Sequence, residues 1–420
     1  MAFLRRIWSR DEAPALVACT ALDVGTEFAK ALVFEIDDNG HGIVRGVGRQ
    51  RQGLAHMQSG TVADIAAVVD NCAVALSEAE EMAGFRPTQV VIGIAGELVK
   101  GFTTSRTQER KRPDLPINEA ELAKLIDGVQ RDALQEAERA ITWETGLAQV
   151  DVRLVHSAIV SASIDGYTLA NPIGFQGRHV KIAIFNAFAP LVHLGALHSV
   201  ASQLDLELLE VVAEPYAVAR VLGQDQVRQA GALFIDVGGG TTDVALVRQG
   251  GIEGTRMFAL GGRAFTKSIA DRLDLPFPRA EALKLDYARG LPIAEHDAIA
   301  GIVRDDVAVW AAGVELVLEE LAVGEMLPSR IHLCGGGAGL AEIHDALASD
   351  RFWRQLPFSR PPEVTIMSPD QVTSITAATS LLVDQQDVTP LGLASQAIGI
   401  HTSEDPLDAA LRRVLRAMKV

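Results

Sequence analysis

Residues 234–247 read Phe-Ile-Asp-Val-Gly-Gly-Gly-Thr-Thr-Asp-Val-Ala-Leu-Val, and residues 21–33 read Ala-Leu-Asp-Val-Gly-Thr-Glu-Phe-Ala-Lys-Ala-Leu-Val. Each stretch is an apolar strand ending in Asp-Val-Gly, then a turn of small and hydroxyl residues and a second apolar strand, which is the pattern of a β-hairpin. With one residue inserted in the later copy, the two match end to end. A spacing of 213 residues (234 − 21) is too long for a solenoid repeat. The sequence therefore predicts two similar halves that face each other across a cleft.

The composition fits a globular protein with more than one domain. The 420 residues include 38 Lys and Arg against 54 Asp and Glu, a formal net charge of −16, with 48% hydrophobic residues. This acidic balance argues against a nucleic-acid partner, because phosphate backbones need a basic face. No apolar run reaches the roughly 18–20 residues of a membrane-spanning helix. Three cysteines without zinc or redox spacing indicate free thiols and favour the cytoplasm.

The rest of the chain alternates helical and strand patterns, which predicts an α/β fold. Strands are expected at 89–94, 150–155, 180–185 and 330–333, and helices over 61–83, 118–140 and most of 264–325. Asn118, with Glu121 three residues later, fits a capping box. The polar, proline-closed residues 100–116 are expected to form an exposed loop.

The two hairpins carry the residue types of a phosphate site. Glycines in a turn let backbone N–H groups converge on an anion, and threonine hydroxyls add donors. Asp23 and Asp236 at the strand ends would repel bare phosphate, which predicts a cation such as Mg²⁺ between them. Lys30 adds a cationic partner for phosphate oxygens. The alternative is a pair of glycine-rich hairpins that merely turn.

Other nucleotide and hydrolase motifs are missing from the sequence. The run Gly335-Gly336-Gly337 follows a predicted strand and opens a helix, but Leu340 stands where GxGxxG needs its last glycine. No GxxxxGK[ST], GxSxG, HExxH or CxxC motif occurs. A dinucleotide-binding Rossmann domain, a P-loop NTPase, a hydrolase triad and a metalloprotease are therefore disfavoured.

The order of the motifs resembles that of the actin, heat-shock-chaperone and sugar-kinase superfamily. The motifs are the two hairpins, Val-Val-Ala-Glu-Pro-Tyr-Ala at 211–217, Leu-Gly-Gly at 260–262 and Cys-Gly-Gly-Gly at 334–337. Within the superfamily, residues from about 18 to 400 resemble the bacterial cell-division family FtsA. Three stretches narrow the resemblance: Asp165-Gly166 with Asn-Pro-Ile-Gly-Phe-Gln-Gly at 171–177, Leu-Gly-Gly-Arg-Ala-Phe-Thr at 260–266, and Ala-Glu-Ala-Leu-Lys at 280–284 with Tyr287.

The resemblance implies an actin-like two-domain ATPase fold, built from duplicated ribonuclease-H-like halves with an inserted SHS2 subdomain (1C). It divides the chain into a basic amphipathic segment (1–14), a first half (1A; 15–86 and 187–214), the insertion (87–186), a second half (2A/2B; 215–400), and a short linker with a C-terminal amphipathic helix (401–420).

The resemblance also implies ATP and Mg²⁺ as cofactors and assigns roles to residues. Asp23 and Asp236 would hold Mg²⁺ through water, Glu214 would orient the attacking water, and Asp243 would support it. The phosphates would lie against Gly25, Thr26, Lys30, Gly238, Gly239, Gly240, Thr241 and Thr242. The nucleoside would lie among Gly261, Gly262, Glu281, Lys284, Gly335, Gly336 and Gly337. A solvated helix face is an equal alternative for Glu281 and Lys284, which share one face by their spacing.

Two positions depart from the family pattern. Glu27 adds negative charge beside the phosphates, and Ser268 stands where the family usually has Asp. Neither departure touches the two aspartates assigned to Mg²⁺. We therefore expect nucleotide binding with at most slow hydrolysis.

Both termini have the pattern of a membrane-binding helix. At the C-terminus Leu407, Leu411, Val414, Leu415 and Met418 fall on one stripe, and at the N-terminus Phe3, Leu4, Ile7 and Trp8 are flanked by arginines. Such segments bind anionic membrane surfaces. The alternative at either end is a helix packed on the protein or a disordered start.

Together, the motifs and the resemblance imply a peripheral protein on the cytoplasmic face of the inner membrane at the division septum. It would bind ATP, polymerise, and tether FtsZ by docking the FtsZ C-terminal peptide within about residues 252–325. One alternative is a PilM-like scaffold of type IV pili that holds a membrane-protein peptide. A small-molecule kinase is another, although nothing marks a sugar pocket.

Overall fold

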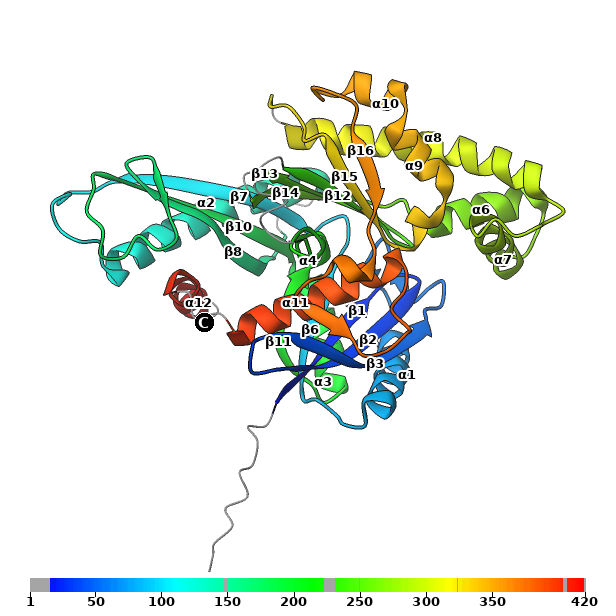
Figure 1. Ribbon diagram of the computed structural model, residues 1–420, viewed down its shortest axis with the longest axis horizontal. Helices are drawn as coiled ribbons and strands as arrows, with labels where there is room; N and C mark the ends of the chain where they lie inside the picture. Colours follow the sequence, from blue (N-terminus) through cyan, green and yellow to red (C-terminus); the bar gives the residue numbers. More distant parts are fainter. Residues whose placement is uncertain are drawn as a thin grey trace, which may run out of the picture.

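The structure is a computed structural model that describes residues 16–146, 150–222, 231–248, 250–322, 324–402 and 406–418 of the 420-residue chain. Figure 1 shows its parts: a first half around β1, β2 and β3, a second half around β12 and β15, and an insertion around α2, β8 and β10. The predicted α/β class is confirmed.

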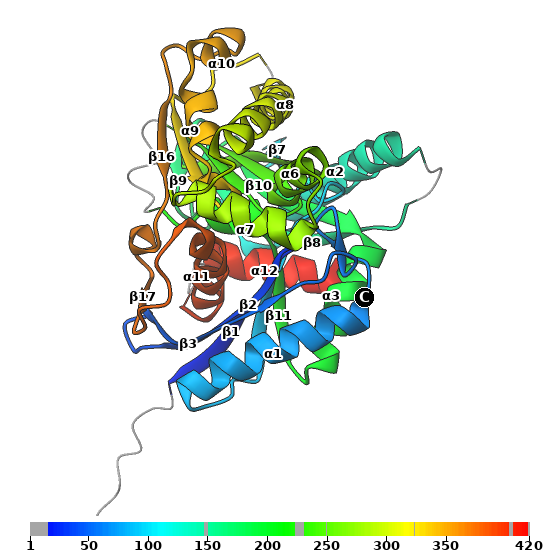
Figure 2. The same cartoon turned by 90° about the vertical axis from the view of Figure 1, so that its right-hand side faces the viewer.

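The first half is built on a six-stranded sheet with the order β11-β6-β1-β2-β3-β17. Its strands are β1 (Val17–Val24), β2 (Phe28–Ile36), β3 (Gly42–Arg51), β6 (Gln89–Ile94), β11 (Glu207–Ala213) and β17 (Ile375–Ala377). Strands β1, β2 and β3 are antiparallel, whereas β6 and β11 run parallel to β1. Figure 2 shows α1 (Ile65–Ala83) and α11 (Val388–Thr402) on opposite faces of this sheet, and α3 (Leu191–Gln203) packs beside α1. A two-stranded hairpin, β4 (Met57–Gln58) and β5 (Thr61–Val62), precedes α1.

The second half repeats this arrangement. Its strands are β12 (Ala232–Val237), β13 (Thr242–Arg248), β14 (Gly251–Phe258), β15 (Arg330–Cys334) and β16 (Glu363–Ile366). The order β14-β13-β12-β15-β16 mirrors β3-β2-β1-β6-β11, with three antiparallel strands followed by two parallel ones. The duplication predicted from the two hairpins is therefore confirmed in the strand topology.

Helices and short turns complete the second half. The helices are α6 (Gly262–Leu273), α7 (Phe277–Ala288), α8 (His296–Ala322), α9 (Ala341–Ala348) and α10 (Asp350–Gln355). The one-turn 3₁₀ elements are η1 (Gly336–Gly339), η2 (Pro369–Gln371) and η3 (Gln385–Asp387).

Strand β12 is apolar except for Asp236, because both of its faces are covered. Successive side chains of a strand point to opposite faces of the sheet. Leu233 and Ile235 join the core beneath α6 and α8 with Trp310, whereas Phe234 joins the core shared with the first half. The short helix α4 (Glu214–Ala219) lies in that shared core and contacts α11, β11 and β12.

The insertion is a helix packed on antiparallel strands. It consists of β7 (Lys100–Glu109), α2 (Glu119–Thr145), β8 (Val152–Ile164), β9 (Tyr167–Leu169) and β10 (His179–Pro190). Only half of the predicted capping box forms: the Asn118 side chain accepts a hydrogen bond from the Glu121 backbone N–H at 2.9 Å, whereas the Glu121 carboxylate accepts from Arg110. The prediction of a loop at 100–116 is wrong for residues 100–109, which form strand β7. Strand β7 forms there because its backbone pairs with β10 along its whole length, although its outer half is exposed.

The sheet of the insertion is continuous with the sheet of the second half. Strand β7 pairs with β14 through Gly101 with Thr255 and Phe102 with Gly254, which joins both sheets into nine strands. The chain enters the insertion from β6 of the first half. The insertion is therefore hydrogen-bonded to the second half, although the chain enters it from the first half.

The C-terminal helix α12 (Pro406–Met418) packs against the insertion, beside α2 and β8 (Figure 1). Leu407, Leu411 and Val414 are 4%, 3% and 8% exposed, and they share a core with residues of α2, β8 and β10. Leu415 is partly buried against the same core. Arg413 anchors the outer face of the helix through an ion pair of 2.7 Å with Glu119.

This packing corrects the expectation that the C-terminal stripe is open to a membrane. A strongly amphipathic helix must cover its apolar face, and the groove between α2 and β8 supplies the cover. The side chain of Met418 and the N-terminal residues Phe3, Leu4, Ile7 and Trp8 lie outside the described part of the protein.

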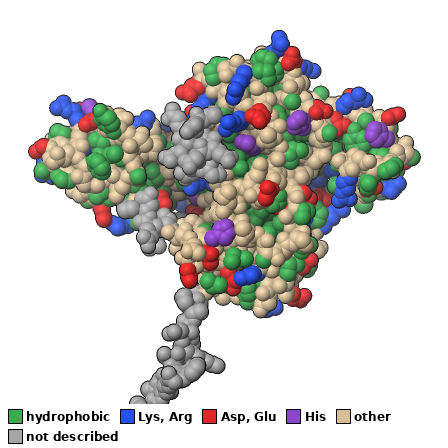
Figure 3. Space-filling view, in the orientation of Figure 1, with side chains coloured by type: hydrophobic (Ala, Val, Ile, Leu, Met, Phe, Trp, Pro, Cys, Tyr) green, Lys and Arg blue, Asp and Glu red, His purple; other side chains and the backbone are tan. Residues whose placement is uncertain are grey.

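The described surface carries charge of both signs. On the face shown in Figure 3, basic and acidic side chains of the described residues are interspersed. Among the described helices, none has the length and apolarity needed to cross a bilayer. Cys19, Cys72 and Cys334 are buried free thiols, as predicted.

Candidate functional site

A cavity of about 570 Å³ lies between the two halves, where β1 and β12 end. Most of the residues singled out in the sequence line it, although they come from elements far apart in the chain. They are Asp23, Gly25, Thr26, Lys30, Glu214, Asp236, Gly238, Gly239, Thr241, Asp243, Gly262, Glu281, Lys284, Gly335, Gly336 and Gly337. The predicted convergence of these residues on one cleft is therefore observed, while their individual roles stay predictions.

The tips of the two hairpins touch each other at the mouth of the cavity. A Cβ atom on Gly239 would lie 2.9 Å from the Cβ of Glu27, and one on Gly240 would lie 2.8 Å from the Thr26 hydroxyl. Contacts this short exclude side chains at both glycines. The glycines of the second hairpin therefore let the two turns approach closely.

Three buried carboxyl groups face the cavity without enough positive charge around them. Burial raises the pKa of Glu214 well above its ordinary value, and repulsion from Asp23 and Asp243 adds to the effect. Burial likewise raises the pKa of Asp243 well above its usual range, helped by repulsion from Asp236. The pKa of Asp236 is also raised, again mainly by burial.

These carboxyl groups fit a bound cation. The Oδ1 atom of Asp243 is buried and has no hydrogen-bond partner. A magnesium ion prefers such oxygen ligands and usually keeps several waters. Among the described residues, no group of three or more His, Cys, Asp or Glu side chains is arranged to hold a metal ion by itself.

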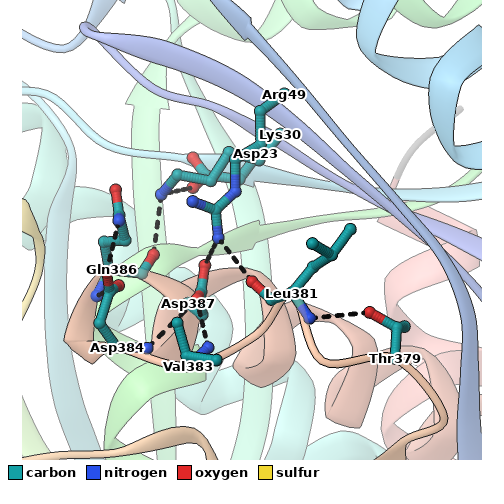
Figure 4. A network of polar contacts seen from close by, with 9 residues as sticks. All are labelled: Asp23, Lys30, Arg49, Thr379, Leu381, Val383, Asp384, Gln386 and Asp387. Atoms are coloured by element: carbon teal, nitrogen blue, oxygen red, sulfur yellow. Dashed lines mark hydrogen bonds and ion pairs between the residues drawn. The ribbon is translucent and has the colours of Figure 1, made fainter.

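Lys30 supplies positive charge at the floor of the site. Its Nζ atom lies 3.2 Å from Asp23 Oδ2 and donates to the Gln386 carbonyl oxygen at 2.8 Å (Figure 4). Burial alone would lower the pKa of Lys30, but attraction and hydrogen bonding from Asp23, with attraction from Asp236 and Asp387, raise it overall. Lys30 therefore remains protonated at neutral pH.

Residues 384–389 form one wall of the cavity and were missed by the sequence analysis. Arg49 binds the fully buried Asp387 carboxylate, which also accepts from the Val383 backbone N–H at 3.0 Å (Figure 4). Thr389 donates a hydrogen bond to Asp236. No sequence motif marks this segment; the Asp387 carboxylate accepts from the Val383 and Asp384 backbone N–H groups at 3.0 and 3.4 Å, before α11 begins.

Glu281 and Lys284 are buried in the cavity wall, so the solvated-face alternative is wrong. They form an ion pair of 2.9 Å, and Lys284 donates to the Gly262 carbonyl oxygen at 2.9 Å and to the Thr266 hydroxyl at 2.8 Å. Lys284 thereby ties α7 to the start of α6. The neighbouring lining is partly apolar and comes from Leu285, Ala288, Leu340 and Ile366.

Two neighbouring glycines of the third run, Gly335 and Gly336, have different surroundings. Gly335 has φ +83°, and a Cβ atom there would lie 2.1 Å from Asp236 Oδ1. Gly336 has open space at the same test position, with no atom within 4 Å. Gly335 is therefore required by the fold, whereas Gly336 leaves the backbone free for a ligand to approach.

Three predicted residues do not line the cavity: Gly240, Thr242 and Gly261. The Thr242 hydroxyl is used inside the second half, where it donates to the Leu260 carbonyl oxygen at 2.7 Å and accepts from Trp310 Nε1 at 2.9 Å. Gly261 packs against the Gly238 carbonyl oxygen. Thr242 and Gly261 therefore make contacts within the second half, and Gly240 packs against Thr26 of the first hairpin. The roles of these three residues toward the nucleotide stay predictions.

The two departures from the family pattern have different surroundings. Ser268 donates a hydrogen bond to Asp306 at 3.0 Å and lies outside the cavity lining. Glu27 lines the cavity, where two arginines contact it.

Comparisons with known proteins agree with the resemblance seen in the sequence. A family model described as "Cell division protein FtsA" matches residues 233–380. The cell division protein FtsA of Pseudomonas aeruginosa is 28% identical over 273 residues, which are 64% of this chain and 61% of that protein. The chain thus spans less than two thirds of that relative. FtsA of Enterococcus hirae is 23% identical over 407 residues, covering 90% of this chain and 87% of that protein.

A solved structure supports the fold. The PilM-PilN type IV pilus biogenesis complex contains a chain with a TM-score of 0.62 and 18% identity, and the match covers 90% of this chain and 98% of that one. The protein described here has an actin-like fold.

Proposed function

From the relationship to the cell division protein FtsA and the actin-like fold, we propose that this protein binds ATP with Mg²⁺ between its halves and links FtsZ filaments to the membrane. It would polymerise on the cytoplasmic face of the inner membrane at the division septum. One observation carries the proposal: two equivalent hairpins each bring an aspartate and a glycine turn to a single buried cavity.

Different residues of the cavity would bind different parts of the nucleotide. Mg²⁺, when bound, would neutralise charge between the phosphates and the two aspartates, Asp23 and Asp236. The backbone N–H groups of the glycine turns would donate to phosphate oxygens, with Lys30 as a fixed cation beneath them. The apolar wall beside Glu281 and Lys284 would hold the nucleoside.

Glu214 is the residue that would orient the attacking water. Burial and its acidic neighbours raise its pKa, and a protonated carboxyl group accepts a hydrogen bond from water less readily than a carboxylate. Positive charge arriving near Asp23 and Asp236 would favour its ionised form. ATP turnover would therefore be slow and dependent on Mg²⁺, with nucleotide acting mainly by fixing the angle between the halves.

The direct test is isothermal titration calorimetry with ATP in Mg²⁺, comparing wild type with Asp236→Asn. Binding by wild type that is weakened at least tenfold in the variant would support the proposal. A control variant, Asp345→Asn, changes an exposed aspartate of α9 and should bind like wild type. Absence of ATP binding by wild type would contradict the nucleotide part of the proposal.

For the FtsZ peptide, we propose the second half between residues 252 and 325. The exposed face of α8 offers an apolar surface for the peptide, since Val309 and Leu316 are each 63% exposed and lie seven residues apart on one helical face. Replacing both by Asp should abolish binding of a fluorescent FtsZ C-terminal peptide, whereas replacing the exposed Val192 of α3 should not.

We propose the N-terminal segment, with Phe3, Leu4, Ile7 and Trp8, as the membrane contact of the folded protein, because the C-terminal stripe is covered by the insertion. Co-sedimentation with anionic liposomes tests this when full-length protein is compared with chains lacking residues 1–10, residues 404–420, or both. Loss of binding on the N-terminal deletion alone supports the proposal. Loss only on the C-terminal deletion would instead assign the contact to α12, released from its groove.

A pilus scaffold is the second candidate, favoured by the coverage of the PilM–PilN match. It would hold a peptide of a membrane protein and would need no membrane contact of its own. A full-length protein that stays out of the liposome pellet with and without ATP, and does not bind the FtsZ peptide, would favour this candidate.

A further inference from the structure

The outer face of α1 exposes apolar side chains among acidic ones. Figure 2 shows α1 on the outside of the first half. Val74 and Met82 are 53% and 43% exposed, and Ala73 is exposed as well. Asp70 and Glu78 lie four residues before and after Val74, so they flank it on the same face of the helix. Exposed apolar side chains that gather with charged neighbours mark a candidate interaction surface.

Helix α1 is also strongly acidic. Its four charged residues are Asp70, Glu78, Glu80 and Glu81, and it contains no Lys, Arg or His. The basic residues next to it are engaged in ion pairs, namely Arg86 with Glu80, Arg45 with Glu35 and Arg49 with Asp387. Asp70 and Glu81 make no ion pair with any residue that the structure describes. The outer face of α1 therefore suits a segment that is both basic and apolar.

The chain enters the first half at the end of the sheet where α1 finishes. Val17, at the start of β1, pairs with Ile36, and Ile36 pairs with Gly42 at the start of β3. Further along β3, a Cβ atom on Gly46 would lie 1.9 Å from the carbonyl oxygen of Ala79, in the last turns of α1. The beginning of β1 and the end of α1 are therefore at the same end of this half.

The N-terminal residues have the composition that this face would bind. Residues 3–8 contain four large apolar side chains, two arginines and no acidic residue: Phe3, Leu4, Arg5, Arg6, Ile7 and Trp8. Residues 9–15 link them to Leu16 and, with Arg10, Asp11 and Glu12, carry one net negative charge. Seven linking residues span up to about 23 Å. The path to the outer face of α1 crosses two strand spacings, about 10 Å, and passes around a helix about 10–12 Å wide, so residues 3–8 can reach it.

We propose that residues 3–8 dock on the outer face of α1 when no membrane is present. The two arginines would face Asp70 and Glu81, and the large apolar side chains would cover Val74 and Met82. The same side chains cannot lie on α1 and in a lipid headgroup layer at once, so an anionic membrane has to compete with the acidic helix for them. The docking needs no lipid, whereas its control of membrane attachment rests on the proposed membrane contact of the N-terminal segment.

Electron paramagnetic resonance of the full-length protein tests the docking. Cys19, Cys72 and Cys334 are buried, so a nitroxide attached to the cysteine of Ser9→Cys reports on the N-terminal segment alone. The spectrum without lipid should contain a slow-motion component that does not depend on protein concentration. Val74→Lys, which removes an apolar contact, and Glu81→Lys, which reverses a charge, should each convert this component to fast motion. High salt should reduce it, because salt screens pairs of exposed charges.

The matched controls make the same changes elsewhere on the surface. Val309→Lys replaces an apolar side chain of α8 that is 63% exposed, and Glu136→Lys reverses an exposed charge of α2. Both should keep the slow-motion component. In co-sedimentation with anionic liposomes, Val74→Lys and Glu81→Lys should bind severalfold more tightly than wild type and than their controls, because the N-terminal segment is already free.

Fast motion in the wild-type background, or a slow-motion component that Val74→Lys leaves unchanged, would overturn the docking. A slow-motion component that grows with protein concentration would overturn it too, and would assign the face of α1 to a second copy of the chain. Equal liposome binding by wild type and the α1 variants would overturn the control of membrane attachment. Docking without any liposome binding by wild type would overturn the proposed membrane contact and leave the docking intact.

Discussion

The ring of Tyr216 stacks on the ring of Phe185, with centroids 5.1 Å apart and planes inclined by 23°. The ring of His156 lies 4.2 Å from the ring of Tyr216, with the planes inclined by 55°. Phe185 and His156 belong to β10 and β8 of the insertion, whereas Tyr216 lies on α4, two residues after Glu214. The insertion thus fixes the short helix that begins with Glu214.

Removal of this ring should loosen the helix. Tyr216 is 5% exposed, and we expect Tyr216→Ala to lower the free energy of unfolding by about 3–5 kcal/mol, as for other buried aromatic residues. Tyr216→Phe keeps the stacked ring and should cost less than about 1.5 kcal/mol. Urea unfolding followed by circular dichroism measures both; equal losses would show that the ring packing does not stabilise α4.

The contribution of three buried carboxyl groups to the stability of the nucleotide-free protein should fall as the pH rises above about 4. Folding raises the pKa of Glu214, Asp236 and Asp243. Their stabilising contribution is complete below the pKa values of the unfolded chain, near 4, and is lost as the pH rises through the folded values, because the folded state then binds more protons than the unfolded state.

Replacing one of these groups should flatten that dependence. The Gln side chain of Glu214→Gln cannot ionise, so the variant avoids the loss of stability that wild type shows as the pH rises from 5 to 8. The difference in the free energy of unfolding should grow by about 1.4 kcal/mol for each pH unit over which Glu214 is protonated only in the folded state. Melting temperatures across this range give the comparison, with the exposed Glu136→Gln as control. Parallel plots of melting temperature against pH for wild type and Glu214→Gln would contradict the raised pKa of Glu214 in the folded protein.

Two adjacent glycines should respond differently to alanine. Gly335→Ala places a methyl group 2.1 Å from Asp236 Oδ1 at positive φ, so it should destabilise the fold by more than about 1 kcal/mol. Gly336→Ala meets no atom within 4 Å and should leave the melting temperature unchanged while weakening ATP binding. Thermal unfolding and calorimetry separate these effects. Unaltered ATP affinity in Gly336→Ala would mean that no ligand approaches the backbone there.

Release of α12 should be detectable without any lipid. Leu411 is 3% exposed, so Leu411→Asp should detach the helix and expose residues 406–418 to protease, with a loss of about 2–5 kcal/mol for the deleted packing. Ala409→Asp introduces the same charge on the exposed face and should resist cleavage like wild type. Limited proteolysis with mass spectrometry reads the cleavage sites; equal protection in both variants would contradict the docked helix.

Local patterns predicted much of this fold and site. The two hairpins and the strand at 89–94 were found from apolar runs bounded by glycine, and β6 has the predicted bounds. The convergence of Asp23 and Asp236 followed from the duplication, because equivalent strands that face each other must bring them together, whereas Glu214, Glu281 and Lys284 followed only from the family resemblance. The domain boundaries expected from the family resemblance stay predictions.

What the sequence did not predict depends on contacts between distant segments. Strand β7 looked like a polar loop because hydrogen bonds to β10, and not burial, hold its outer half. The wall at 384–389 has no motif, and its place is fixed by Arg49, more than 300 residues earlier (387 − 49 = 338). The charge of Glu27 could not be judged without the two arginines that approach it from separate elements.

The join between β7 and β14 bears on attempts to dissect the protein. An insertion in the sequence invites excision, yet removing residues 100–190 would uncover the edge of β14, where backbone groups now pair with Gly101 and Phe102. It would also strip α12 of its cover and bare Leu407, Leu411 and Val414. An open strand edge and an uncovered apolar stripe are both prone to aggregation. A shortened chain that precipitates would therefore report on these two surfaces and not on the activity of the missing part.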